Sequence, residues 1–268
     1  MVAENLEKLF GLAGKKILLT GAAGGIGAVL AKGLAGAGGE MLLSDIARDK
    51  LESLAAEING GGGLADAFYM DVGNPESIRA AVEEIIGAAG RVDVLINCAG
   101  INRREGFLDV TEETYDRIMD INLKGLYFVS QETAKHMMAK KSGNIINVAS
   151  HNSVGMLGGC SVYGASKSAV TALTRSMAVE WAQYGIRANA IAPGHILTPL
   201  TTATWEHPER AAYLRERIAM RRPGTPEELV GVVIMLASDA SSYMSGMMIH
   251  VDGGCLAGGS PWPYDTKY

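Results

Sequence analysis

The sequence of 268 residues is short of cysteine, of basic charge and of long apolar runs. Only three cysteines occur, Cys98, Cys160 and Cys255, with no Cys-x-x-Cys pair, so a disulfide scaffold and the usual thiolate zinc sites are excluded. The 24 basic residues are outnumbered by 29 acidic ones and do not cluster, which argues against a nucleic-acid surface. The longest apolar stretch, 229–237, is about half of what a bilayer requires. We therefore expect a cytoplasmic protein with no nucleic-acid or membrane partner.

Short apolar runs flanked by glycine alternate with longer segments of helical period along nearly the whole chain. This alternation predicts repeated strand–helix–strand units around a parallel sheet. We expect one doubly wound, Rossmann-like α/β domain over residues 1–268, with a mostly parallel seven-stranded sheet and helices on both faces. The expected strands are 16–20, 40–44, 65–70, 92–97, 144–149, 187–192 and 247–251.

Two segments interrupt this alternation. A charged stretch at about 195–222 is interpreted as a substrate-loop insertion, and residues 261–268 form an aromatic C-terminal tail. We expect both to bear on specificity, and the tail either closes over a substrate pocket or packs on an interface. The helices expected between the strands are 48–58, 75–86 and one beginning at Pro226, with Asn74 and Thr111 as N-caps.

A glycine-rich turn, TGAAGGIG at 20–27, separates the first expected strand from a helix of small residues. Glycine permits positive φ and close backbone approach, and the free N–H groups at a helix start can bind a pyrophosphate. The candidate dinucleotide ligands are therefore Gly21, Gly24, Gly25, Ile26 and Gly27. The alternative interpretation is that these glycines only shape a turn and a helix–sheet contact.

Asp45 ends the second expected strand, 18 residues after Gly27, where a carboxylate can accept hydrogen bonds from the adenosine ribose. The same charge would repel a ribose 2′-phosphate about 4 Å away by about 1 kcal/mol in water, and by about 4 kcal/mol at an effective dielectric of 20. We therefore expect NAD as the cofactor, with NADP disfavoured. Arg48 lies three residues further on and could reach such a phosphate, which keeps NADP open.

Tyr163 and Lys167 lie four residues apart in a segment of helical pattern, so both project from one face. A lysine beside a tyrosine is expected to lower the pKa of the phenol, which could then act as a general base toward an alcohol. Ser150 ends an apolar strand 13 residues before Tyr163, where its hydroxyl could hold the substrate oxygen.

With these motifs the sequence resembles the short-chain dehydrogenase/reductase family along almost its whole length. It also carries Asn-x-Ala-Gly at 97–100 and Pro-Gly-x3-Thr at 193–198, both typical of that family. The resemblance implies a homotetramer and a further catalytic residue, Asn122, which would support a water chain from Lys167. It implies cofactor contacts from Asp71, Val72, Asn97, Ala99, Gly100, Tyr163, Lys167, Pro193, Gly194, Ile196 and Thr198.

The expected reaction is reversible hydride transfer between a nicotinamide and a secondary alcohol, with Tyr163 as the base. Arg103 and Arg104 offer forked donors that suit a carboxylate. The run at 97–104 also looks like that of the subgroup acting on gluconate and deoxygluconate, with Cys98 as a small departure. We expect a sugar, sugar acid or polyol, held by Ser150, Asn152, Tyr163, Arg103 and Arg104.

Two rival functions remain open. A 3-oxoacyl carrier-protein reductase would share the same catalytic set, although Asp45 argues mildly against the NADPH that reductive biosynthesis normally uses. A nucleotide-binding protein without catalysis is the second alternative, and the intact Ser150, Tyr163, Lys167 and Asn122 argue against it. The five histidines show no paired metal-binding spacing, so no metal site is expected.

Overall fold

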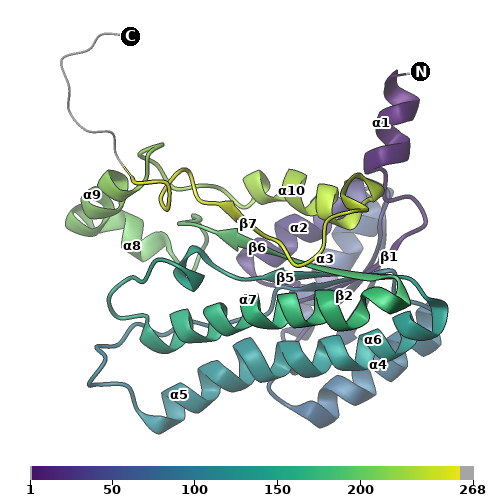
Figure 1. Cartoon of the computed structure of the whole chain (residues 1–268), viewed down its shortest axis with the longest axis horizontal. Coiled ribbons are helices and arrows are strands. Elements are labelled where there is room, and N and C mark those ends of the chain that lie inside the picture. The colour runs from purple at the N-terminus through teal and green to yellow at the C-terminus, as the bar shows by residue number, and fades with distance from the viewer. Residues whose placement is uncertain (1, 260–268) are drawn as a thin grey trace.

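A computed structural model describes residues 2–259 and contains a seven-stranded sheet in which every neighbouring pair is parallel (Figure 1). The strands are β1 (Lys16–Thr20), β2 (Glu40–Asp45), β3 (Leu64–Tyr69), β4 (Val94–Asn97), β5 (Gly143–Val148), β6 (Ile186–Pro193) and β7 (Met248–Val251). Their order is β3-β2-β1-β4-β5-β6-β7. The predicted doubly wound fold class is confirmed, with a sheet that is parallel throughout.

Helices cover both faces of the sheet (Figure 1). They are α1 (Val2–Phe10), α2 (Gly25–Gly36), α3 (Arg48–Gly60), α4 (Pro75–Ala89), α5 (Glu112–Met119), α6 (Leu126–Lys140), α7 (Ser161–Trp181), α8 (Thr202–Glu206), α9 (Pro208–Arg217) and α10 (Glu227–Ala237). Short turns of other helix types are the π-helix η1 (Asp120–Gly125) and the 3₁₀-helices η2 (His151–Ser153), η3 (Ala182–Tyr184) and η4 (Asp239–Ser241). No helix within residues 2–259 is both long and apolar enough to cross a membrane.

Strand β1 shows why the central strands are apolar on both sides. Ile17 and Leu19 pack with α2, α3 and α10 in one core, whereas Leu18 packs with α4, α6 and α7 in a second core on the other face. All three side chains are fully buried. A strand covered on both faces has to be a nearly continuous apolar run, and this is the pattern from which the parallel sheet was predicted.

The predicted helix starts agree with the structure to within one residue. Asn74 accepts a hydrogen bond from Glu76 N at 2.9 Å, and Thr111 accepts one from Thr114 N at 3.2 Å, so both predicted N-caps are confirmed. Helix α10 begins at Glu227, one residue after the expected Pro226, which instead occupies the capping position. The charged stretch 195–222 contains α8 and α9, and the predicted aromatic tail 261–268 lies outside the described residues.

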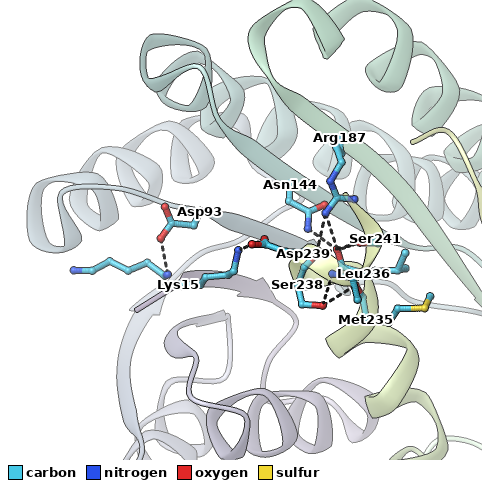
Figure 2. A network of polar contacts seen from close by, with 11 residues as sticks. Lys15, Asp93, Asn144, Arg187, Met235, Leu236, Ser238, Asp239 and Ser241 are labelled. Atoms are coloured by element: carbon cyan, nitrogen blue, oxygen red, sulfur yellow. Dashed lines mark hydrogen bonds and ion pairs between the residues drawn. The ribbon is translucent and has the colours of Figure 1, made fainter. Parts of the chain in front are cut away.

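A polar network at the amino ends of the strands fixes the end of α10 (Figure 2). The Leu236 carbonyl accepts hydrogen bonds from Asn144 Nδ2 at 2.6 Å, Arg187 Nη2 at 3.2 Å and Ser241 Oγ at 2.9 Å. Asn144 belongs to β5 and Arg187 to β6, so side chains of both strands bind this helix end. The carboxyl ends of the strands lie on the opposite side of the sheet from this network.

The strand order reverses between β1 and β4, because β2 and β3 lie on one side of β1 while β4 to β7 lie on the other. In open α/β sheets a ligand crevice forms outside the carboxyl ends of the strands at this switch point. Helices α8 and α9, which follow β6, lie at the opposite end of the molecule from α1 (Figure 1).

Candidate active site

A cavity of about 620 Å³ opens at the switch point. It runs from the glycine turn after β1, past the carboxyl ends of β2, β4 and β5, to the loop after β6 and helix α8. Its volume lies in the range of cavities that bind small molecules and cofactors. The motifs from the two halves of the sequence therefore line one cavity.

The glycine turn is held against the end of β4. Gly21 has a φ of +68°, and a Cβ on it would lie 2.7 Å from Ala99 Cα, so a side chain is excluded both by the backbone conformation and by contact. Thr20 Oγ1 accepts hydrogen bonds from Cys98 N at 3.1 Å and Ala99 N at 3.3 Å. A narrow glycine cradle next to the start of α2 results, which fits a pyrophosphate.

Asp45 lines the cavity at the end of β2. Its carboxylate accepts hydrogen bonds from Ala23 N in the glycine turn and from Ala47 N, each at 3.0 Å, which fixes its position. Arg48 does not line the cavity, because its guanidinium lies over the Tyr69 ring at 4.3 Å from the centroid. Lys50 is the basic side chain that reaches this end of the cavity.

All but one of the predicted cofactor residues line the cavity. Those that do are Gly21, Gly24, Gly25, Ile26, Gly27, Asp45, Asp71, Val72, Ala99, Gly100, Tyr163, Lys167, Pro193, Gly194, Ile196 and Thr198. Asn97 does not line it. Asn97 is buried in the protein interior, and its Nδ2 donates to Ser130 Oγ and to Asn147 Oδ1, each at 2.9 Å. These hydrogen bonds therefore fix the end of β4.

Ser150 follows β5 and turns the chain into η2. Its Oγ accepts a hydrogen bond from Asn152 N at 3.1 Å and also forms a hydrogen bond with the Tyr163 hydroxyl. Turn η2 is tied to α7 by Ser153 Oγ, which donates to the Lys167 carbonyl at 2.8 Å. The structure thus brings together Ser150, Tyr163 and Lys167, which all line the cavity.

The expected effect of Lys167 on Tyr163 is wrong for this structure. Burial raises the pKa of Tyr163, the hydrogen bond from Ser150 opposes this rise, and Lys167 does not contribute. The reason is the direction of the lysine, because its Nζ donates to the Val148 carbonyl at 2.7 Å and lies 5.9 Å from the Tyr163 ring centroid. Burial also lowers the pKa of Lys167 to about 8.

Asn122 lies in the π-helical turn η1, which joins α5 to α6. It is fully buried and does not line the cavity, since its Oδ1 accepts from Ile101 N at 2.8 Å and its Nδ2 donates to Ile101 O at 2.9 Å. A Cβ on Gly100 would lie 3.3 Å both from Asn122 Oδ1 and from Lys167 Nζ. Asn122 and Lys167 therefore flank the same glycine.

The two predicted substrate arginines point in different directions. Arg104 lines the cavity and donates to Thr204 Oγ1 of α8 at 3.1 Å, whereas Arg103 does not line it. The Arg103 side chain is 68% exposed and forms an ion pair with Glu105 at 2.7 Å. Asn152 lines the cavity, is buried, and has an Oδ1 without a hydrogen-bond partner.

Several further residues line the cavity at the end nearest Ser150, and sequence reasoning did not predict that they meet there. The ring centroids of His151 and His195 lie 4.5 Å apart with the ring planes tilted by 57°, and Trp205 lies 6.3 Å from His195, edge to face. Their signal in the sequence was position, since His151 follows Ser150 and His195 follows the Pro-Gly pair. Leu157, Cys160, Leu200 and Leu214 also line the cavity. Within residues 2–259, no group of three or more His, Cys, Asp or Glu side chains could hold a metal ion.

Comparisons with known proteins agree with this geometry. The family described as Enoyl-(Acyl carrier protein) reductase matches residues 21–255. The 5-keto-D-gluconate 5-reductase of Escherichia coli K12 is 39% identical over 251 residues, which cover 94% of this chain and 99% of that protein. A 3-oxoacyl-[acyl-carrier-protein] reductase of Thermotoga maritima is 40% identical over 247 residues, covering 91% of this chain and 99% of that protein.

A solved structure is also similar over nearly the whole chain. The gluconate 5-dehydrogenase of Burkholderia cenocepacia, solved in complex with NADP and tartrate, has a TM-score of 0.91 and 37% identity, covering 93% of this chain and 98% of that one. Sequence and structure comparisons thus agree over nearly the whole chain. The chain belongs to the short-chain dehydrogenase/reductase family of NAD(P)-dependent oxidoreductases.

Proposed function

We propose that this protein, as a single dinucleotide-binding domain, interconverts a secondary alcohol and a ketone on a sugar acid of the gluconate type. The observation that carries the proposal is the hydrogen bond between the Ser150 and Tyr163 hydroxyls inside the cavity that also contains the glycine cradle. A substrate oxygen placed beside these two groups would lie next to a proton acceptor and a hydrogen-bond donor at once.

The chain's own residues then have distinct tasks. Ser150 holds the substrate oxygen, and the Tyr163 phenolate accepts the hydroxyl proton during oxidation and returns it during reduction. The nicotinamide, when bound, supplies or accepts the hydride. Lys167 is buried in the cavity wall, where its ammonium would orient the nicotinamide ribose when the cofactor is bound. Asn122, which flanks the same glycine as Lys167, supports proton exchange between the lysine and solvent.

Arg104 supports an acidic substrate. It is the arginine of the cavity end near Ser150, and its forked donors suit a carboxylate. Relatives with sugar-acid names, and a similar structure that holds the dicarboxylate tartrate, favour the same chemistry. Arg103, which pairs with Glu105, would contribute only if it left that ion pair.

The second candidate is a 3-oxoacyl carrier-protein reductase, which the Thermotoga maritima relative favours. Its product is also a secondary alcohol, so Ser150, Tyr163 and Lys167 would serve it equally well. The polar groups Arg104, His151, Asn152 and His195 at the substrate end suit a hydroxylated acid better than an acyl chain.

We also propose NAD rather than NADP as the preferred cofactor. Asp45 is held by two backbone N–H groups at the adenosine end, and Arg48 lies over Tyr69 instead of in the cavity. The NADP found in a similar structure, and Lys50 in this cavity, favour the alternative.

We also propose that the protein is a homotetramer and that it is cytoplasmic. Apolar side chains stand exposed on adjacent helices, namely Tyr115 of α5, Tyr127 of α6 and Val179 of α7. The three cysteines are free thiols, which suits a reducing compartment.

The test is NADH absorbance with D-gluconate, 5-keto-D-gluconate, other sugar acids and polyols, and an acetoacetyl thioester, each with both cofactors. We expect turnover of a sugar acid with NAD and little turnover of the thioester. Preferential reduction of the thioester with NADPH would favour the carrier-protein reductase instead, and no turnover with any substrate would contradict both.

A further inference from the structure

Two histidines of the cavity have no part in the proposed chemistry. His151 follows Ser150 in η2, and His195 lies in the loop after β6, yet their ring centroids are 4.5 Å apart. Trp205 of α8 meets His195 edge to face at 6.3 Å. Side chains from three separate segments thus meet at the substrate end of the cavity.

The hydrogen-bond state of His151 follows from its surroundings. Its Nδ1 lies 3.3 Å from the Pro193 carbonyl, and because a carbonyl only accepts, Nδ1 carries the hydrogen. Burial lowers the pKa of His151, so the ring is neutral at pH 7. Its Nε2 is therefore an acceptor, and no residue within 2–259 donates a hydrogen bond to it.

His195 and Asn152 add further unpaired polar atoms. Burial lowers the pKa of His195 to about 4, so this ring too is neutral and offers one donor and one acceptor. Within the described part of the chain, neither ring nitrogen has a hydrogen-bond partner. Asn152 Oδ1 is buried without a partner as well. A buried acceptor such as Asn152 Oδ1 is unfavourable in this state until a ligand donates to it.

We infer that His151, His195 and Asn152 form a wall that recognises the non-reacting hydroxyl groups of a polyhydroxylated chain. The inference rests on the proposed function, because it assigns the specificity of the same site. A hydroxyl group can both donate to His151 Nε2 or Asn152 Oδ1 and accept from His195. An alkyl chain would leave all of these atoms unpaired, and a site of this kind rejects such a ligand.

The wall and Arg104 recognise different groups of the ligand. Neutral imidazoles contribute no net charge, so a carboxylate is left to Arg104, which is fixed to Thr204 at the edge of the same end. A ligand that carries a carboxylate and several hydroxyls would satisfy both parts, whereas a plain carboxylate would satisfy only Arg104.

Two six-carbon carboxylates separate these contributions. D-gluconate carries five hydroxyl groups and hexanoate carries none, so calorimetric titration of each into the NADH-saturated enzyme measures what the hydroxyl groups contribute to binding, without turnover, and variants of the wall show its share. We expect D-gluconate to bind more tightly than hexanoate. His195→Phe keeps an aromatic ring beside His151 but removes both ring nitrogens. This variant should bind D-gluconate about tenfold more weakly, while its binding of hexanoate stays the same or tightens.

Matched variants exclude a general effect on folding. His195→Asn, which keeps a donor and an acceptor, should retain most of the D-gluconate affinity. His207→Phe makes the same substitution at an exposed histidine outside the cavity and should change neither affinity. His151→Phe is the second, independent variant of the wall, and the dissociation constant of NADH shows whether each variant keeps its cofactor site.

Two results would overturn the inference. One is equal binding of D-gluconate and hexanoate by the unmodified enzyme, and the other is an unchanged ratio of the two affinities in both His195→Phe and His151→Phe. Selective D-gluconate binding without oxidation of any sugar acid would leave the wall in place and contradict the proposed reaction, so the two failures are distinguishable.

Discussion

At the scale of single residues, Tyr163 carries the strongest prediction. Its hydroxyl is hydrogen-bonded to Ser150 in a buried setting, and Tyr163→Phe removes the proposed proton acceptor while leaving the ring in place. We expect kcat to fall by about 10²–10⁴, the usual contribution of general acid–base catalysis. The dissociation constant of NADH, measured by nicotinamide fluorescence, should stay within about twofold. Retention of most of the activity would identify a different base.

Asp45 is predicted to decide between the cofactors. Asp45→Asn removes the charge and keeps an acceptor for one of the two backbone N–H groups that bind this side chain. NADPH should then bind about tenfold more tightly relative to NADH, because the repulsion of a 2′-phosphate is lost. Arg48→Ala is the control and should shift this ratio little, since Arg48 is held over Tyr69. A ratio unaffected by Asp45→Asn would contradict the assignment.

His195 is predicted to make the stability of the protein sensitive to acid. Burial first, and then the neighbouring His151 and Arg104, lower its pKa from 6.5 to about 4. Between these values the unfolded chain binds a proton that the folded chain does not, so folding stability falls as the pH is lowered through this window. The full effect is at most about 3 kcal/mol. Urea unfolding of the unmodified chain and of His195→Phe should show that the variant loses less stability between pH 6.5 and 4.5; parallel losses would contradict the prediction.

At the scale of elements, the network in Figure 2 is predicted to stabilise the fold without affecting the site. Arg187 donates to the carbonyls of Met244, Leu236 and Ser238, at the sheet edge away from the cavity. Arg187→Met should therefore lower the free energy of unfolding by about 2–4 kcal/mol, because three partly buried carbonyls lose a charged donor. The KM values of substrate and cofactor should be unchanged.

Lys15→Met provides the control for this element. Lys15 forms an ion pair with Asp239 at 3.0 Å in the same region, but both side chains are partly or largely exposed. Such surface pairs contribute about 0–1 kcal/mol. An equal loss of stability in Lys15→Met and Arg187→Met would show that burial of the network is unimportant.

The elements themselves were largely predictable. Strands such as β1 are apolar on both faces, and Asn74 and Thr111 mark helix starts by a purely local hydrogen bond, so their signals lie within a few consecutive residues. The π-helical turn η1 around Asn122 was not predicted, since it is a single short turn between two α-helices. The directions of Arg103 and Arg104 also depend on distant partners, Glu105 and Thr204.

At the scale of the whole molecule, the proposed tetramer makes the last prediction. Val179 is 80% exposed on α7, and α7 contacts α6, on which Tyr127 is exposed. If these faces meet other subunits, Val179→Glu places a charge in an apolar interface and should reduce the mass measured by light scattering from four chains to fewer. A monomeric unmodified protein, or a variant of unchanged mass, would contradict this interface.

The sequence by itself determined the parallel sheet, the glycine turn, and the residues that could bind a dinucleotide, because each is encoded by spacing along a short stretch of chain. Only the tertiary structure decided that Lys167 Nζ binds the Val148 carbonyl, that Asn97 faces the interior, and that His151 and His195 share a wall of the cavity. The reason is physical. Side-chain direction, burial and the resulting pKa depend on atoms contributed by segments far apart in sequence, and these meet only once the sheet has assembled.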